Sequence, residues 1–376
     1  MNGNLKIEHF SLKDNRVEDF TQLPNVLFKD LPFWITPLRV QIKENFSLTK
    51  NPFWKFVESR LFIVYRDKQM LGRIAAVYHP GYNSIHTKKT GFFGFLDAVD
   101  DAEVFKLLFE GCAAWLKEFN VSRMIGPLNP SLNYELGVLV DGFDRFPKFM
   151  MPYNPEYYNQ RILQSGFEKS VDFYAYNLDR SAFQLSPRMT KVKIWLESRF
   201  EITFVNIDFS KIKTDAKKVF EIYNDAFEGH WGFTPFELEE VTYMAYELKA
   251  IVDEDLFFFI YINGSIAGYI LALPDLNEAI RHLKNGRLLP FGLFKLLYYS
   301  KKIKRIRVLN VGVKSKYRHL GLGVLLYEEL QRRMGKKNYE GGELSWVVEN
   351  NPDMNQGAQE IGAKVVKKYR IYERGL

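Results

Sequence analysis

The sequence predicts an α/β fold of the α+β kind, in which two tandem domains each form a mixed, mostly antiparallel sheet flanked by helices. Three observations support this prediction: an internal repeat, the order of strand-like and helix-like segments in each copy, and a glycine-bearing turn between a strand and a helix near the C-terminus. With 376 residues, the chain is long enough for two ordinary domains that each bury a core of their own.

The internal repeat has an offset of 196 residues. Residues 62–76 and 258–272 both read as a β-hairpin, with an aromatic and aliphatic strand, a polar turn and a second strand that contains glycine. Residues 154–176 and 351–372 both read as a Pro-initiated helix, a glycine and a final strand. Three pairs of residues share the offset: Gly72 and Gly268, Gly166 and Gly362, and Tyr176 and Tyr372. One offset at both ends of each copy predicts two copies of one fold.

The boundary between the copies is expected between residues 178 and 200, where strand character ends and Ser186-Pro187 marks a break. The prediction is therefore a first domain over residues 1–180, a linker over 181–200 and a second domain over 201–376. The second domain opens with a strand at 202–209 and a helix at 215–227, and it carries an insertion at about 276–304.

The most informative segment of the second domain is 308–330, which runs from an apolar, β-rich stretch through a basic turn into an amphipathic helix. The first N–H groups of such a helix lack partners, and the helix dipole adds about half a positive charge there. Gly321 and Gly323 let an anion approach the main chain closely, and Lys314 and Lys316 add positive charge. The turn therefore suits a phosphate or diphosphate, unless it is a plain helix start without a ligand.

Two familiar phosphate-binding loops do not match this turn. Leu326 stands where a dinucleotide fingerprint needs a small residue, and the Gly-Lys-Ser/Thr of the P-loop is absent. The turn instead resembles motif A of the GNAT superfamily of acyl-CoA-dependent N-acyltransferases, which reads Arg/Gln-x-x-Gly-x-Gly/Ala between the fourth strand and the third helix. The matching residues are Arg318, His319, Leu320, Gly321, Leu322 and Gly323.

The first domain carries a resemblance of its own. The phrases at 31–38, 50–54 and 71–76 look like a little-characterised bacterial family of tandem GNAT proteins. The paired arrangement is also similar to that of aminoacyl- and myristoyl-transferases, in which one copy keeps the donor site and both shape the acceptor groove.

The resemblance implies a binding mode for an acyl-CoA, with acetyl-CoA as the first choice. The strand before motif A would splay from the next strand, and the pantetheine amides would pair with the backbone of Val311, Gly312 and Val313. Residues 318–323 would bind the diphosphate, and Asn351 would contact the pantetheine or the neighbouring helix.

The corresponding place in the first domain lacks motif A. Four acidic residues crowd the start of its helix: Asp97, Asp100, Asp101 and Glu103. Carboxylates at that place cap a helix and suit its dipole, but they repel a diphosphate. We expect this domain not to bind acyl-CoA in that way.

GNAT chemistry is the direct attack of an amine on a thioester, helped by a base. The candidate bases are Glu349 at the end of a strand, and Glu228 or His230 in a loop whose Trp231 and Phe233 form either an acceptor wall or a cover for the core.

Many relatives use a tyrosine as the acid that protonates the thiolate, and Ala358 occupies that position here. Tyr369 and Tyr372 are possible substitutes on the following strand, unless both are packing aromatics.

The insertion, within Leu276–Arg307, mixes apolar helix-like stretches with Lys and Arg. Four interpretations stay open: a lid over an apolar acceptor, a membrane-surface helix, a docking site for acidic acyl carrier protein, or a core helix with a solvated basic face.

Composition limits the remaining function classes. The net charge of +7 comes without any nucleic-acid-binding signature, and no apolar run has the 18 or more residues of a membrane span. No His, Cys or Asp cluster has metal-ligand spacing. The single cysteine, Cys112, lies in a helical pattern that predicts burial, and a lone cysteine suits a cytoplasmic protein.

Three functions follow from these observations. The first is an N-acyltransferase that moves an acyl group, expected to be acetyl, from acyl-CoA to an amine in a groove between the two domains. The second is a long-chain N-acyltransferase that uses acyl carrier protein or acyl-CoA on a lipid-like amine. The third is a non-catalytic CoA-binding or scaffold protein.

Overall fold

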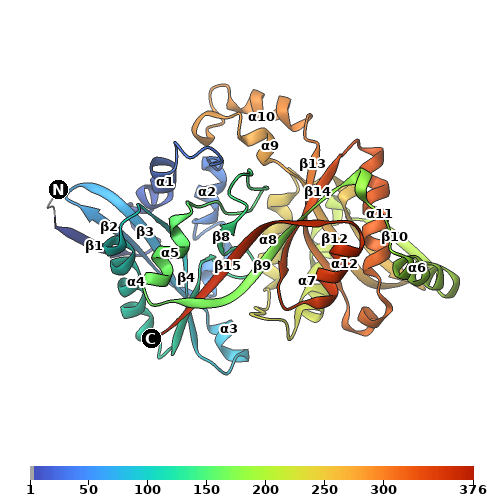
Figure 1. The fold of residues 1–376 in the computed structure, drawn as a ribbon, viewed down its shortest axis with the longest axis horizontal. Coiled ribbons are helices and arrows are strands. Elements are labelled where there is room, and N and C mark those ends of the chain that lie inside the picture. Colours follow the sequence, from blue (N-terminus) through green and yellow to red (C-terminus); the bar gives the residue numbers. More distant parts are fainter. Residues whose placement is uncertain (1–3) are drawn as a thin grey trace. The chain divides into compact units, whose positions relative to one another are not determined.

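The computed structural model describes residues 4–376, which form two compact units. The first unit comprises the residues up to Asp172, Ile280–Leu296 and Lys367–Leu376. The second comprises Phe173–Ala279 and Leu297–Val366. Figure 1 labels the elements along the chain.

The sheet of the first unit takes its strands from both ends of the chain. Its strands, in spatial order, are β1 (Leu5–Phe10), β2 (Glu58–Arg66), β3 (Gln69–Tyr78), β4 (Thr90–Ala98), β5 (Arg123–Gly126) and the C-terminal β15 (Lys364–Gly375). β4 and β5 are parallel, and the other neighbours in this order are antiparallel. β8 (Val138–Asp141) also pairs with β15, while β6 (Leu128–Asn129) and β7 (Glu135–Leu136) form a small separate ladder.

The sheet of the second unit repeats this order. Its strands are β10 (Ile202–Asn206), β11 (Phe257–Ile262), β12 (Ser265–Pro274), β13 (Arg305–Val313), β14 (Gly341–Val348) and β9 (Glu168–Asp179). β13 and β14 are parallel and the others antiparallel. The predicted fold class of mixed, mostly antiparallel sheets flanked by helices is confirmed, and each sheet takes its last strand from the other half of the sequence.

Helices accompany each sheet. Those of the first unit are α1 (Val17–Leu27), α2 (Arg39–Asn45), α3 (Pro80–Ile85), α4 (Ala102–Lys117) and α5 (Tyr157–Gln164). Those that follow are α6 (Pro187–Arg199), α7 (Ile212–Phe227), α8 (Leu238–Leu248), α9 (Asn277–Ile280), α10 (Gly292–Ser300), α11 (Gly323–Lys336) and α12 (Pro352–Glu360). The 3₁₀ turns are η1 (Pro52–Lys55), η2 (Arg180–Ala182), η3 (Phe209–Lys211), η4 (Glu254–Leu256), η5 (Lys284–Gly286) and η6 (Ser315–Leu320). No helix within residues 4–376 is both long and apolar enough to cross a bilayer.

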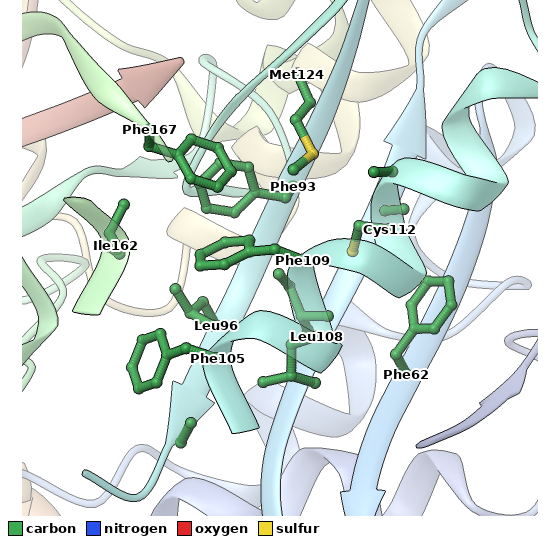
Figure 2. Close-up of a cluster of buried hydrophobic side chains, with 14 of the residues drawn as sticks. Phe62, Phe93, Leu96, Phe105, Leu108, Phe109, Cys112, Met124, Ile162 and Phe167 are labelled. Atoms are coloured by element: carbon green, nitrogen blue, oxygen red, sulfur yellow. The ribbon is translucent and has the colours of Figure 1, made fainter. Parts of the chain in front are cut away.

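The core of the first unit forms around α4. Asp101 caps the helix by accepting a hydrogen bond from the N–H of Glu103, and apolar residues recur at helical spacing on one face. Figure 2 shows Phe105, Phe109 and Cys112 from that face within a cluster of buried side chains. Burial raises the pKa of the Cys112 thiol far above its usual range, which fits the packing role expected from the sequence.

Two of the three pairs of repeat anchors have a shared structural reason. Gly166 and Gly362 follow α5 and α12 and have φ values of +83° and +92°, a region that favours glycine. The Tyr372 hydroxyl donates to Asn159 Oδ1 at 2.6 Å, and the Tyr176 hydroxyl donates to Asn355 Oδ1 at 2.7 Å. Asn159 and Asn355 are again 196 residues apart. The same tyrosine–asparagine bond therefore fixes the last strand of each sheet to the helix beside it.

The predicted linker region, 181–200, contains α6. The Ser186 hydroxyl accepts a hydrogen bond from the N–H of Met189 at 3.2 Å, and Pro187 occupies the first turn. Both residues, which marked the break in the sequence, thus begin a helix of the second unit.

Candidate functional site

The candidate site lies where β13 leads into α11 through η6. Gly321 follows η6 in the left-handed region, with φ 74° and ψ 34°, and α11 begins at Gly323. The N–H groups of Leu322 and Gly323 donate to no backbone carbonyl within residues 4–376. A Cβ at Gly323 would have its nearest neighbour, a Tyr327 ring carbon, 3.9 Å away. The helix start therefore offers two backbone donors and open space to an anion.

The end of α7 braces this turn. Asp225 accepts two hydrogen bonds from Ser315, one from the N–H at 2.6 Å and one from Oγ at 2.8 Å. Arg318 Nη2 donates to the carbonyl oxygen of Ala226 at 2.8 Å. The Arg318 guanidinium is thus bound to the C-terminal end of α7. In the sequence, the only signal for Asp225 is that a carboxylate stands just before the 227–233 loop.

β13 and β14 diverge beside the turn. Their parallel register runs from Arg305 opposite Gly341 to Val308 opposite Leu344, whereas β13 continues to Val313. Val311, Gly312 and Val313 stay paired with β12 on their other side. The edge of β13 beyond Val308 is therefore not paired with β14, which is the splay that the resemblance implies for a pantetheine arm.

Gly312 has a packing reason to be glycine. A Cβ there would lie 2.9 Å from the ring of Tyr269, which is fully buried and donates its hydroxyl to Asn310 Oδ1 at 2.7 Å. A larger residue would push β13 away from β12 at the place where the pantetheine is expected to bind.

The first unit has a similar strand divergence, but its own chain fills the space. The parallel register of β4 and β5 ends at Phe92 opposite Ile125. Beyond it, a Cβ at Gly94 would lie 1.6 Å from the carbonyl oxygen of Leu128. Asn129 Oδ1 also accepts a hydrogen bond from the N–H of Phe95 at 2.6 Å. A pantetheine arm in this place would have to displace residues 128–129.

The acidic residues at the start of α4 are held by arginines. Asp97 pairs with Arg73 at 2.7 Å, and Asp100 pairs with Arg161 at 2.7 Å. Asp101, the cap of α4, pairs with Arg66 at 2.9 Å. These contacts keep carboxylates at the helix start, where motif A would place a diphosphate. Glu103 adds a fourth carboxylate in the first turn of α4.

The candidate bases Glu228, His230 and Glu349 all belong to the second unit, as the turn does. Glu228 is exposed at the C-terminal end of α7. The His230 ring nitrogen Nδ1 lies 3.1 Å from the carbonyl oxygen of Phe227. Because a carbonyl only accepts, this contact favours the neutral tautomer with the proton on Nδ1 and the lone pair on Nε2. Glu349 follows β14, and its carbonyl oxygen accepts from the Asn355 amide at 3.4 Å.

Two further residues make structural contacts, and a third is exposed. Asn351 caps α12, its Oδ1 accepting from the N–H of Met354 at 3.1 Å. Trp231 lies edge-on to the buried Phe173, with ring centroids 5.8 Å apart, so this loop aromatic covers part of the core. His319 is exposed in the last turn of η6, next to the half-buried Leu320.

Tyr372 and Tyr369 belong to the first unit, whereas motif A belongs to the second. Both side chains are fully buried, and the Tyr372 hydroxyl is bound to Asn159. Burial raises the pKa of Tyr372, which makes it a weaker acid. Ala358 is buried on α12, at the position of the tyrosine that many relatives use.

Comparison with known proteins agrees with this geometry. The acetyltransferase (GNAT) family matches residues 216–360, which include the turn. Protein YghO of Escherichia coli (strain K12) is 34% identical over 371 residues, covering 97% of this chain and 94% of that protein. The bacterial ceramide synthase of Caulobacter vibrioides (strain NA1000 / CB15N) is 34% identical over 367 residues, covering 95% and 94%.

Solved structures share the fold at low identity. A tandem GNAT protein from the clavulanic acid biosynthesis pathway has a TM-score of 0.55 at 10% identity, covering 99% of this chain and 98% of that one. A probable N-acyltransferase from Enterococcus faecalis V583 has a TM-score of 0.52 at 10% identity, covering 99% and 73%. The family match, the tandem fold and the two relatives that span nearly the whole chain show that this protein belongs to the GNAT family and is an N-acyltransferase.

Proposed function

We propose that this protein transfers a long-chain acyl group from acyl-CoA to the amino group of a lipid-like amine. The observation that carries the donor assignment is the helix start at Leu322 and Gly323, with two backbone donors and open space beside a splayed strand. The lipid-like acceptor rests on the relative that is called a bacterial ceramide synthase and matches 95% of this chain. We also propose a cytoplasmic location, because a single cysteine, Cys112, suits a reducing compartment.

In this proposal only the second unit holds the donor. The N–H groups of Leu322 and Gly323 bind the diphosphate, and the backbone of Val311–Val313 pairs with the pantetheine amides. In the first unit, residues 128–129 and the carboxylates at the start of α4 oppose the same ligand.

The reaction needs one proton acceptor and one stable leaving group. The amine nitrogen attacks the thioester carbon, the new C–N bond forms, the C–S bond breaks, and a base takes the amine proton. We assign the base to His230, because the Phe227 carbonyl leaves Nε2 with a free lone pair; Glu228 and Glu349 are the alternatives. A thiol pKa of about 8.5 lets the thiolate leave without a dedicated acid, so Ala358 does not prevent turnover.

Gly323 gives the sharpest test of the donor site. A side chain fits there without strain, so Gly323→Glu should leave the fold intact while its carboxylate repels the diphosphate. Calorimetry with a long-chain acyl-CoA should show affinity weakened by at least about tenfold in Gly323→Glu and little changed in Gly323→Ala. Lys336→Glu, at the other end of α11, is the charge control. Equal affinity in Gly323→Glu and the wild type would refute the assignment.

An acetyl donor is the second candidate, because the matching family is described as an acetyltransferase family. A panel of acyl-CoA chain lengths with one long-chain amine distinguishes the two. Release of CoA that rises with acyl length supports the proposal, and turnover with acetyl-CoA alone favours the second candidate.

A further inference from the structure

The segment from Leu289 to Tyr298 is the most exposed apolar surface among the described residues. Leu289, Phe291 and Phe294 are 77%, 72% and 70% exposed, more than any other large apolar side chain of residues 4–376. Leu293, Leu297 and Tyr298 are exposed as well, and α10 has no buried residue. A water-exposed cluster of this size marks a surface that binds something apolar.

Hydrogen bonds and close packing hold the apolar turn in shape. The N–H of Leu293 donates to the carbonyl oxygen of Leu288 at 2.7 Å. A Cβ at Gly292 would lie 1.9 Å from the carbonyl oxygen of Arg287, so the chain closes tightly there. The turn therefore presents Leu289 and Phe291 outward from a defined backbone.

The base of the segment is attached to the first unit. A Cβ at Gly286 would lie 2.0 Å from the carbonyl oxygen of Pro37, and Arg39 Nε donates to the carbonyl oxygen of Asn285 at 3.2 Å. Leu283, which shortly precedes Asn285 and Gly286 in the chain, is also buried. A fixed base with a protruding apolar tip differs from a core helix with a solvated basic face, which was one of the interpretations of this sequence.

The segment and its flanks carry a net charge equal to that of the whole chain. Residues 280–304 contain seven Lys or Arg and no Asp or Glu, which gives +7. The whole chain has 52 basic and 45 acidic residues, so the remaining residues have 45 of each and a net charge of zero. Four of the seven cations, Arg287, Lys295, Lys301 and Lys302, lie in the same stretch as the exposed apolar side chains. Arg281 instead lies over the Phe146 ring, and Lys304 pairs with Glu340.

Lys302 shows how charge and apolar surface meet. Its Nζ donates to the Tyr298 hydroxyl at 2.6 Å and lies 4.1 Å from the centre of that ring. Aromatic rings with a polar edge and lysines with long apolar stems are the side chains that settle at the boundary between acyl chains and headgroups.

We propose that residues 287–302 dock this protein on an anionic phospholipid surface, with Leu289, Phe291 and Phe294 inserted among the acyl chains. The nine-residue α10 is far too short to span a bilayer, so it lies at the interface. The lysines around it bind the headgroups. An acidic protein would match the charge as well, but the three most exposed apolar side chains on a helix without buried residues favour insertion among acyl chains, and binding to acyl carrier protein is an outcome of the test.

Sedimentation with vesicles tests this proposal without any turnover measurement. The wild-type chain should bind vesicles of phosphatidylcholine with phosphatidylglycerol, and bind phosphatidylcholine alone much more weakly. Phe291→Ser with Phe294→Ser should weaken binding to the mixed vesicles by at least about tenfold. Val26→Ser with Leu163→Ser, which removes two exposed apolar side chains elsewhere, should bind like the wild type.

Two results would overturn the docking proposal: no vesicle binding by the wild type, or unchanged binding by the double phenylalanine variant. If the wild type binds acyl carrier protein but not vesicles, the segment is a protein-docking site instead. Leu289→Ser serves as a second variant if the double variant unfolds. The proposal is independent of the acyl-donor site, because Gly323→Glu should bind vesicles normally and the double phenylalanine variant should still bind acyl-CoA.

Discussion

His79 shows how one buried side chain makes the stability of this protein depend on pH. Its Nδ1 accepts a hydrogen bond from the N–H of Tyr82 at 3.1 Å and so caps α3. Burial lowers the pKa of His79 to about 4 from its ordinary value of 6.5. Between those two values the unfolded chain binds a proton that the folded protein does not bind. The free energy of unfolding therefore falls as pH drops from 6.5 towards 4.

His79→Asn should remove this pH dependence and keep the cap, since asparagine is a good helix N-cap. From the pKa shift, His79 costs the folded wild type about 2 kcal/mol between about pH 7.5 and about pH 5. Urea unfolding at both pH values measures the difference. The variant should lose about 2 kcal/mol less than the wild type over this interval. Identical losses in both proteins would show that His79 does not titrate on unfolding.

Single residues also show what the sequence can and cannot predict about the site. The positions of Gly321 in the turn and Gly323 at the helix start were predictable, because their spacing and the following helix lie within one short segment. Asp225 was not, because its partner Ser315 is 90 residues away in the chain. Gly94 was not either: its close approach to Leu128 depends on a strand divergence that no local pattern reveals.

At the scale of elements, the last strand of each sheet is fixed to a neighbouring helix by one tyrosine–asparagine bond. The sequence placed Tyr372 among the candidate acids because it follows the helix in which relatives carry their tyrosine. The structure gives its hydroxyl a partner in Asn159 of α5. Our proposed function therefore assigns Tyr372 a structural role.

Tyr372→Phe should lower the free energy of unfolding by about 1–3 kcal/mol, because Asn159 Oδ1 would lose its buried donor. Tyr176→Phe is the matched variant, since it removes the equivalent bond to Asn355. Thermal unfolding and steady-state turnover should be measured on both variants. Turnover below the unfolding transition should stay near that of the wild type. A large loss of turnover in Tyr372→Phe with no loss of stability would instead identify it as the acid.

At the scale of the whole molecule, the sequence predicted two copies of one fold but not how the copies share strands. The offset of 196 residues identifies equivalent segments, but it does not show which sheet each final strand joins. In the structure, Lys367–Leu376 belong to the first unit and Phe173–Asp179 to the second. Both final strands follow a helix and a glycine and carry the repeated tyrosine, Tyr176 or Tyr372, so the repeat pattern alone does not distinguish which sheet each one joins.

The exchange predicts how the chain responds to a cut near the expected domain boundary. Gln184 is exposed between η2 and α6, so a protease site inserted after it should be cleaved in the folded protein. The two pieces should then elute together on gel filtration, because the second piece supplies Tyr369, Ile371 and Tyr372, all fully buried, to the first unit.

A fragment of residues 1–184 made alone lacks β15, so β5 and β8 lose their partner strand and an apolar layer of the core is exposed. We expect this fragment to aggregate or to show no cooperative thermal unfolding by circular dichroism, and a fragment of residues 185–376 lacks β9 and should behave likewise. The uncut protein with the inserted site is the control for both. Pieces that separate after cleavage and each unfold cooperatively would instead support independent domains at 1–180 and 201–376, because each piece would then hold every strand that its sheet requires.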